Sequence, residues 1–271
     1  MTGDEKLLAD FEAIALRAGK VVLKAFRDGC AVSAKADNSP VTAADRDAEA
    51  VILAGLFDAC PGIPIVAEEE VSEGRVVAKP GREFILVDPL DGTREFVSGS
   101  GDFTVNIALV RDGAPVLGVV LAPVSGTLFS GRPGHAERVE LTDDVEPTGR
   151  RRIFVRRCGP VPTIVASRSH GSPATDLYVT QIKQAELVHV GSSLKFCMLA
   201  AGEADIYPRF GRTMQWDTAA GDAVLRAAGG MTQTLDGAPL RYGPGAEGPE
   251  CYANPNFIAV GEGVTLPEVS L

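Results

Sequence analysis

The chain has 271 residues, of which 45% are hydrophobic and 23% charged, with a formal net charge of −10 and an isoelectric point near 4.9. This is ordinary globular composition, which excludes a disordered or collagen-like chain, and the length suffices for one large domain or two packed halves. The acidic balance argues against broad nucleic-acid binding, because most of the surface would repel a phosphate backbone. An anionic small molecule stays open as a ligand, since bound divalent cations make a carboxylate cluster locally positive.

The first 60 residues predict two helices. Apolar side chains recur at helical spacing from Glu5 to Phe26. After turn-forming residues at 35–40, Thr42 is a typical N-cap for a second helix over 43–59, which Pro61-Gly62 ends.

Strands are predicted for the next part of the chain. Short apolar runs at 63–67 and 84–87 indicate strands, and the second is expected to end at Asp88-Pro89 because proline cannot continue a ladder. Two longer apolar runs, 103–110 and 114–122, flank a polar turn and indicate a hairpin.

The second half of the chain mixes strands and helices. Residues 131–157 are charged and punctuated by glycine and proline, so edge strands and loops are expected there. A strand is expected over 163–167, and helices over 176–184, 193–201 and 217–228. This order favours a layered α/β or α+β sandwich. We expect an N-terminal half of residues 1–130 and a C-terminal half of residues 131–271.

The cysteines and the hydropathy pattern bear on location. The cysteines are odd in number, scattered and without a C-x-x-C pair, which argues for reduced thiols: Cys30, Cys60, Cys158, Cys197 and Cys251. The N-terminus is acidic where a signal peptide is basic, and the most apolar stretch, Val105 to Val124, contains Arg111, Asp112 and Pro115. We expect a cytoplasmic protein without an integral membrane segment, and peripheral membrane association stays open.

Acidic residues stand at three structural boundaries. Glu68 follows one predicted strand, Asp88 and Asp91 follow another, and Asp217 opens a predicted helix. Folds place ligand-binding groups at such boundaries, because a rigid scaffold ends there and backbone groups become available. Taken singly, Glu68 is more readily explained as part of a solvated face and Asp217 as a helix N-cap.

The segment Asp88-Pro89-Leu90-Asp91-Gly92-Thr93 carries chemistry beyond its charges. Pro89 biases Asp88 to an extended conformation, and Gly92 permits a tight turn and close approach of a ligand. If a helix starts near Thr93, the amides of Gly92 and Thr93 face the same space as the aspartates and can bind phosphate oxygens. Carboxylates for a hard cation beside amides for an oxyanion predict a metal-assisted phosphate site.

Three motifs in this order resemble the inositol monophosphatase superfamily: Ala67-Glu68-Glu69, Val87-Asp88-Pro89-Leu90-Asp91-Gly92-Thr93 and Trp216-Asp217-Thr218-Ala219-Ala220-Gly221. The resemblance covers nearly the whole chain. It implies a sandwich of alternating α/β/α/β/α layers of the sugar-phosphatase type. It also implies a magnesium-dependent, lithium-sensitive phosphatase.

Further segments are similar to the bacterial 3′(2′),5′-bisphosphate nucleotidases within that superfamily: Lys35-Ala36-Asp37-Asn38-Ser39-Pro40-Val41-Thr42-Ala43-Ala44-Asp45, Ser167-Arg168-Ser169-His170, Gly191-Ser192-Ser193-Leu194-Lys195-Phe196-Cys197 and Tyr207-Pro208-Arg209-Phe210. This implies hydrolysis of adenosine 3′,5′-bisphosphate, a by-product of sulfur metabolism, to AMP and phosphate.

The resemblance also assigns roles to residues. Two or three Mg²⁺ ions are implied, with carboxylate ligands and one backbone carbonyl from Glu68, Asp88, Leu90, Asp91 and Asp217. In the implied catalytic set, Thr93 orients the attacking water, Asp45 polarises Thr93, and Glu68 helps to steer the water. Trp216 is expected to pack and orient Asp217.

Substrate contacts are expected on two sides. The metal side comprises Glu68, Leu90, Asp91, Gly92, Thr93 and Asp217. The nucleotide side comprises Ser193, Lys195 and Arg209, with His170 as a weaker candidate. Lys195 and Arg209 could equally be ordinary surface charges.

Two other functions remain open at this point. One is an inositol-phosphate or related sugar-phosphate phosphatase. The other is a non-catalytic metal- or nucleotide-binding regulator on the same fold, although all six of Asp45, Glu68, Asp88, Asp91, Thr93 and Asp217 are present. The expected partner is a small nucleotide bisphosphate, and the sequence does not predict the oligomeric state.

Overall fold

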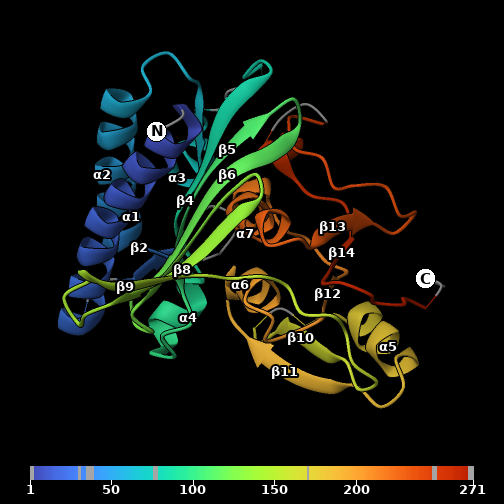
Figure 1. Cartoon of the computed structure of the whole chain (residues 1–271). Coiled ribbons are helices and arrows are strands. Elements are labelled where there is room, and N and C mark those ends of the chain that lie inside the picture. The colour runs from blue at the N-terminus through green and yellow to red at the C-terminus, as the bar shows by residue number, and fades with distance from the viewer. Residues whose placement is uncertain are drawn as a thin grey trace.

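The computed structural model of the chain describes residues 3–29, 32–34, 40–75, 79–169, 171–245 and 249–267. Figure 1 shows helices α1 (Gly3–Asp28) and α2 (Ala43–Ala59) covering one face of a seven-stranded sheet. Helices α6 (Leu194–Ala200) and α7 (Gln215–Ala227) lie between this sheet and a five-stranded one, and α5 (Pro173–Gln181) packs on the far side of the smaller sheet. The expected α/β/α/β/α sandwich is therefore confirmed.

The seven-stranded sheet has its strands in chain order: β3 (Ile65–Ala67), β4 (Glu83–Asp91), β5 (Thr104–Arg111), β6 (Ala114–Ala122), β7 (Thr127–Arg132), β8 (His135–Leu141) and β9 (Pro147–Arg152). Only the β3–β4 pair is parallel. The expectation of edge strands and loops over 131–157 was wrong for β7 and β8, which lie inside the sheet. Their apolar positions Leu128, Phe129 and Val139 are buried, and the charged residues of β8 are half-buried. Of the strands in this region, only β9 lies at an edge of the sheet.

The five-stranded sheet has the order β11-β10-β12-β14-β13. Its strands are β10 (Thr163–Ser167), β11 (Glu186–Val190), β12 (Ile206–Arg209), β13 (Met231–Thr234) and β14 (Phe257–Val260). The remaining elements are the paired β1 (Val32–Ala34) and β2 (Pro40–Thr42), the short helices α3 (Glu68–Ser72) and α4 (Thr93–Ser98), and the 3₁₀ helix η1 (Pro249–Tyr252). The expected division of the chain at residue 130 falls inside β7, and whether the halves behave as units stays a prediction.

Local capping explains where the helices begin. α2 has the expected bounds, because the Thr42 hydroxyl accepts from the Ala44 amide and Asp45 accepts from the Thr42 amide. α7 starts two residues before the expected Asp217, because the Asp217 carboxylate accepts from the Met214 amide at 2.7 Å and so acts from inside the first turn. α5 likewise starts at Pro173, not at residue 176, since the Ser172 hydroxyl caps it.

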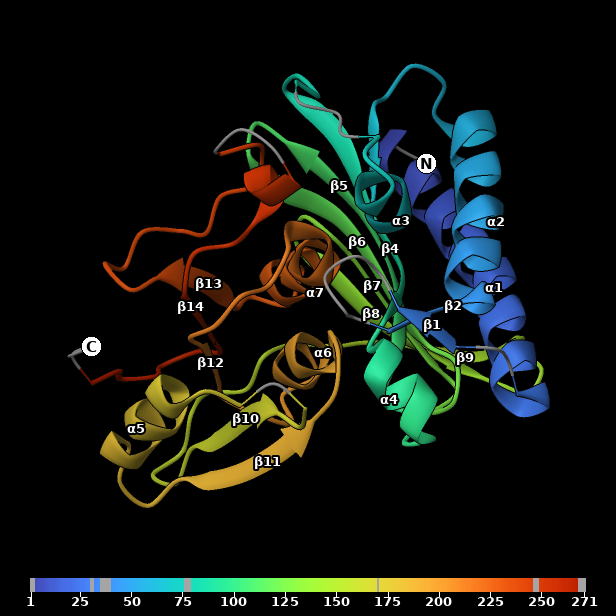
Figure 2. The same cartoon turned by 180° about the vertical axis from the view of Figure 1, so that it is seen from behind.

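Close packing brings α7 against the seven-stranded sheet. A Cβ on Gly118 of β6 would lie 2.3 Å from the carbonyl oxygen of Ala220 in α7, so glycine is required at that crossing. Apolar side chains fill both faces of the sheet, one face under α1 and α2 and the other under α6 and α7. Figure 2 shows α4 and α6 facing each other beside α7, so that segments far apart in sequence border one space.

Two expectations concern thiols and membranes. Cys60, Cys158, Cys197 and Cys251 are free thiols, and Cys30 lies outside the described residues, as do the predicted turn at 35–39 and His170. Within the described ranges, no helix combines the length and apolar character needed to cross a bilayer.

Candidate active site

The segment 88–93 lies at the end of β4 and in the turn that follows. β4 continues to Asp91 and does not end at Asp88-Pro89, which corrects the expected boundary. Asp88 pairs with Asn106 and Asp91 with Thr104, so three steps on β4 oppose two on β5. The bulge accommodates Pro89, which has no amide hydrogen to donate to β5, and it places both aspartates at one end of the sheet.

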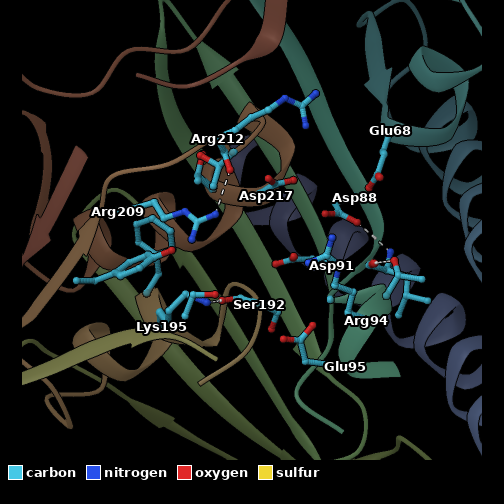
Figure 3. A pocket seen from close by; sticks show the side chains of 18 residues that line it. Glu68, Asp88, Asp91, Arg94, Glu95, Ser192, Lys195, Arg209, Arg212 and Asp217 are labelled. Atoms are coloured by element: carbon cyan, nitrogen blue, oxygen red, sulfur yellow. Dashed lines mark hydrogen bonds between the residues drawn. The ribbon is translucent and has the colours of Figure 1, made fainter. Parts of the chain in front are cut away.

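Five acidic residues line a cavity of about 490 Å³, and four of them are the predicted carboxylate ligands of the metal. Figure 3 shows Glu68, Asp88, Asp91 and Asp217 reaching the same space from α3, β4 and α7. We call these four residues the acidic wall. Asp88 is buried, whereas Glu68, Asp91 and Asp217 keep part of their surface open. The predicted metal ligands are thus brought together from both halves of the chain.

Crowding of the acidic wall disfavours its ionised form. Burial, followed by the charges of Glu68, Asp91 and Asp217, raises the pKa of Asp88 well above its usual range. Burial, followed by the neighbouring carboxylates, also raises the pKa of Asp217. Burial raises the pKa of Asp91 to about 6, and Lys195 and the Ser193 hydroxyl oppose that rise. A bound divalent cation would relieve this repulsion.

The donor set fits a hard cation. Carboxylate oxygens and a backbone carbonyl are the ligands that Mg²⁺ takes in proteins. In the described part of the chain, no three Asp, Glu, His or Cys side chains are already close enough together to form a ready-made ion site. The acidic wall therefore has the chemistry for Mg²⁺ and would have to draw together around it.

Asp45 and Thr93 are in contact, as the resemblance implies. The Thr93 hydroxyl lies 3.3 Å from Asp45 Oδ1 and 3.2 Å from the Leu90 carbonyl oxygen, and either can take its single hydrogen. Asp45 Oδ2 accepts from the amide and the hydroxyl of Thr42, which fixes its orientation. Thr93 thus keeps a lone pair available on the cavity side.

Gly92 forms the turn between β4 and α4. Its φ is 95°, and an added Cβ would meet the Asp102 carbonyl oxygen at 3.1 Å. The glycine therefore places the start of α4 at the cavity, which Gly92, Thr93, Arg94 and Glu95 all line. This confirms that a helix starts at Thr93.

Two buried basic side chains line the cavity beside the acidic wall. We call Lys195 and Arg209 the cationic wall. Both are at least nine-tenths buried, so neither is an ordinary surface charge. Burial lowers the pKa of Lys195 to about 8, and Asp91 opposes that fall. The Lys195 ammonium donates to the carbonyls of Ser192 and Val190, and Arg209 donates to the Arg212 carbonyl at 3.0 Å.

Ser193 is placed differently from its expected role. It is 2% exposed and does not line the cavity, and its hydroxyl contacts Asp91 and the Asp217 carbonyl. Its neighbour Ser192 does line the cavity, with φ at 48°. Adjacent serines carry no local signal for which of them lines the cavity, and the nucleotide contact expected of Ser193 stays a prediction.

The cavity is also lined by residues for which no individual role was predicted from the sequence: Arg94, Glu95, Ser167, Ser192, Phe196, Tyr207, Arg212, Thr213 and Thr218. Five of them lie inside the motifs that carry the family resemblance, and the other four lie within three positions of a motif, so closeness to a motif was the available signal. Trp216 is buried and packs near Tyr252, with ring centroids 6.3 Å apart, which agrees with its expected packing role.

Fold and site together define a phosphatase of the metal-dependent sugar-phosphatase class. The model of the inositol monophosphatase family matches residues 4–265, and the chain belongs to that family.

Individual members of the family are also similar to the chain. The chain is 44% identical over 247 residues to the 3′(2′),5′-bisphosphate nucleotidase CysQ of Escherichia coli K12, covering 90% of this chain and 95% of the relative. The CysQ of Shigella flexneri is 43% identical over the same shares. Among solved structures, CysQ from Bacteroides thetaiotaomicron is 36% identical with a TM-score of 0.79, covering 94% of this chain and 97% of that one. An inositol monophosphatase from Anabaena is 25% identical, with a TM-score of 0.73 and coverage of 97% and 93%.

Proposed function

We propose that this chain is a magnesium-dependent phosphomonoesterase that hydrolyses adenosine 3′,5′-bisphosphate to AMP and phosphate. The observation that carries the proposal is the meeting of two walls in one cavity, four carboxylates and two buried cations. The 43–44% identity to relatives named 3′(2′),5′-bisphosphate nucleotidase supports the same substrate class.

The acidic wall would hold two or three Mg²⁺ ions, together with the Leu90 carbonyl. When bound there, Mg²⁺ supplies Lewis-acid chemistry that lowers the pKa of water and offsets charge on the phosphate and the leaving oxygen. Glu68 and Asp91 keep surface open toward the cavity, so their oxygens are available to such ions. Asp217 reaches the same space from the other half of the chain.

Thr93 and Asp45 orient the attacking water in this proposal. With its hydrogen given to Asp45 or to the Leu90 carbonyl, the Thr93 hydroxyl can accept a hydrogen bond from water at the cavity edge. The Gly92 and Thr93 amides at the start of α4 donate to the phosphate oxygens. Water attacks phosphorus and gives up a proton, the phosphorus–oxygen bond to the ribose breaks, and the leaving 3′-oxygen takes up a proton, so that the bisphosphate and one water give AMP and phosphate.

The cationic wall would bind the second phosphate of the substrate. A phosphate outside the metal site needs charged or amide donors, and Lys195 and Arg209 are the buried cations that line this cavity. Ser192 lies on the cavity wall, but its hydroxyl is buried, and its carbonyl accepts a hydrogen bond from the Lys195 ammonium. An inositol monophosphate has no second phosphate, so this wall favours the bisphosphate over the sugar-phosphate alternative.

A side-by-side substrate comparison tests the proposal. Phosphate release is measured from adenosine 3′,5′-bisphosphate and from inositol 1-phosphate at the same Mg²⁺ concentration. A higher kcat/KM for the nucleotide is expected. Faster turnover of the inositol ester would contradict the nucleotide assignment. If neither substrate is hydrolysed, the non-catalytic regulator is favoured. The cytoplasmic location stays a prediction.

A further inference from the structure

The Ser193 side chain lies behind the acidic wall and contacts two of its members, Asp91 and Asp217. Its hydroxyl oxygen lies 2.9 Å from Asp91 Oδ2 and 2.6 Å from the Asp217 backbone carbonyl oxygen. Asp91 belongs to β4 and Asp217 to α7, so one buried hydroxyl joins segments that lie 126 residues apart in the sequence (217 less 91).

Asn106 of β5 holds that hydroxyl from the other side. Its Nδ2 lies 2.9 Å from the Ser193 oxygen and 3.5 Å from Asp91 Oδ2. Asn106 and Ser193 are 1% and 2% exposed, so both hydrogen bonds lie away from bulk water. If the amide of Asn106 donates into a Ser193 lone pair, the serine hydrogen is left for Asp91 or the Asp217 carbonyl.

Packing alone does not explain a buried asparagine at this point. Its Oδ1 has no hydrogen-bond partner among the described residues, and such a group costs free energy when it is taken out of water. A leucine or valine would satisfy a central strand better. What Asn106 provides is a donor to the Ser193–Asp91 pair.

We infer that Asn106 and Ser193 are positioning residues that fix the Asp91 carboxylate and tie it to Asp217, so that the two halves present their metal ligands together. The inference rests on the proposed metal-dependent function. It gives Ser193 a role in holding the ligands, in place of the nucleotide contact expected from the sequence. Partners behind a metal ligand typically contribute about 10- to 100-fold to metal affinity.

Adjacent serines provide a matched test. Ser193→Ala removes the hydroxyl behind Asp91, whereas Ser192→Ala removes a neighbouring buried hydroxyl that has no hydrogen-bond partner among the described residues. Mg²⁺ binding is measured by calorimetry without substrate, and melting temperatures in chelator report on folding. We expect Ser193→Ala to weaken Mg²⁺ binding at least about 10-fold, and Ser192→Ala to leave Mg²⁺ binding unchanged.

A double-mutant cycle provides the second measurement. If Asn106 acts through Ser193, then Asn106→Ala weakens Mg²⁺ binding, and adding Ser193→Ala causes little further loss. Wild-type Mg²⁺ affinity in Ser193→Ala, or additive losses in the double variant, would overturn the inference. Wild-type turnover of the bisphosphate tests the proposed function separately, because an inactive chain could still show this pattern of Mg²⁺ binding.

Discussion

The two walls of the cavity carry opposite charges, and burial shifts the pKa values of Asp91 and Lys195 in opposite directions. The acidic wall gathers like charges, and burial, with a further contribution from their repulsion, raises the pKa values of Asp88, Asp91 and Asp217. The cationic wall buries Lys195, and loss of water lowers its pKa to about 8. Each wall is electrostatically unfavourable alone and is stabilised by the ligand it is proposed to bind, a cation for one and a phosphate for the other. The walls should therefore fail in different ways when they are altered.

Removing a charge from the acidic wall should have the largest effect. Asp91→Asn is expected to lower kcat more than about 100-fold, because a charge that organises the reacting centre is lost. The melting temperature in chelator should not fall, since one member of a repelling set is removed. Steady-state kinetics and thermal melting check this. The exposed Asp58→Asn on α2 is the matched control, and near-normal turnover of Asp91→Asn would show the metal assignment to be wrong.

Removing a charge from the cationic wall should affect substrate and not metal. Lys195→Gln is expected to lower kcat/KM for the bisphosphate about 10- to 100-fold, the contribution of one buried charge-assisted hydrogen bond. Mg²⁺ affinity should not fall, because Lys195 repels cations from Asp91. The exposed Lys183→Gln serves as the control. If Lys195→Gln lowers Mg²⁺ affinity and leaves KM unchanged, the proposal that the cationic wall binds substrate and not metal is wrong.

The pH dependence of the cationic wall follows from its lowered pKa. Below about pH 8 Lys195 is charged and can bind phosphate, and above it the ammonium loses its proton well before the usual 10.5. We expect kcat/KM for the bisphosphate to fall above about pH 8 and the fall to move to higher pH in Lys195→Arg, which stays charged. If kcat/KM of Lys195→Arg falls over the same pH range as that of the wild type, a group other than Lys195 causes the fall.

Glu49 of α2 should give the smallest effect, on stability. Its carboxylate accepts from the Glu69 and Glu70 amides at 2.9 and 3.1 Å, and burial raises its pKa to about 7. The unfolded group loses its proton near 4.5, so the folded state holds more protons between these values and stability falls as pH rises through that window.

Glu49→Gln should flatten that fall. After allowance for solvent and counterions, a difference of about 1 kcal/mol, or about 2–4 °C in melting temperature, is expected between pH 5 and pH 8 in chelator. The exposed Asp47→Asn on the same helix should melt like the wild type at both values. An identical pH slope in Glu49→Gln and the wild type would show that Glu49 does not titrate in this window.

The helices and the acidic wall could be predicted from the sequence because their signals are local. Thr42 and Asp45 fix the start of α2 through bonds within four residues, and the glycine after Asp91 marks the turn into α4. The acidic wall was predicted because its four residues stand at predicted strand and helix boundaries and within the motifs of the family resemblance.

What sequence reasoning missed depends on distant contacts. The strand through Pro89 survives because a bulge against β5 accommodates it, and β7 lies inside the sheet because β8 pairs with it across a hairpin. Ser193 lies behind the cavity wall, where it contacts Asp91, the Asp217 carbonyl and Asn106, which is 87 residues away in the sequence. No local pattern records such a contact.

Phosphate release from adenosine 3′,5′-bisphosphate across a Mg²⁺ series, with AMP identified as the product, tests the central claim most directly. The two-wall arrangement predicts no release in chelator, release that rises with Mg²⁺, and AMP as the nucleotide product. Release that is unchanged by chelator, or no release at any Mg²⁺ concentration, would contradict it.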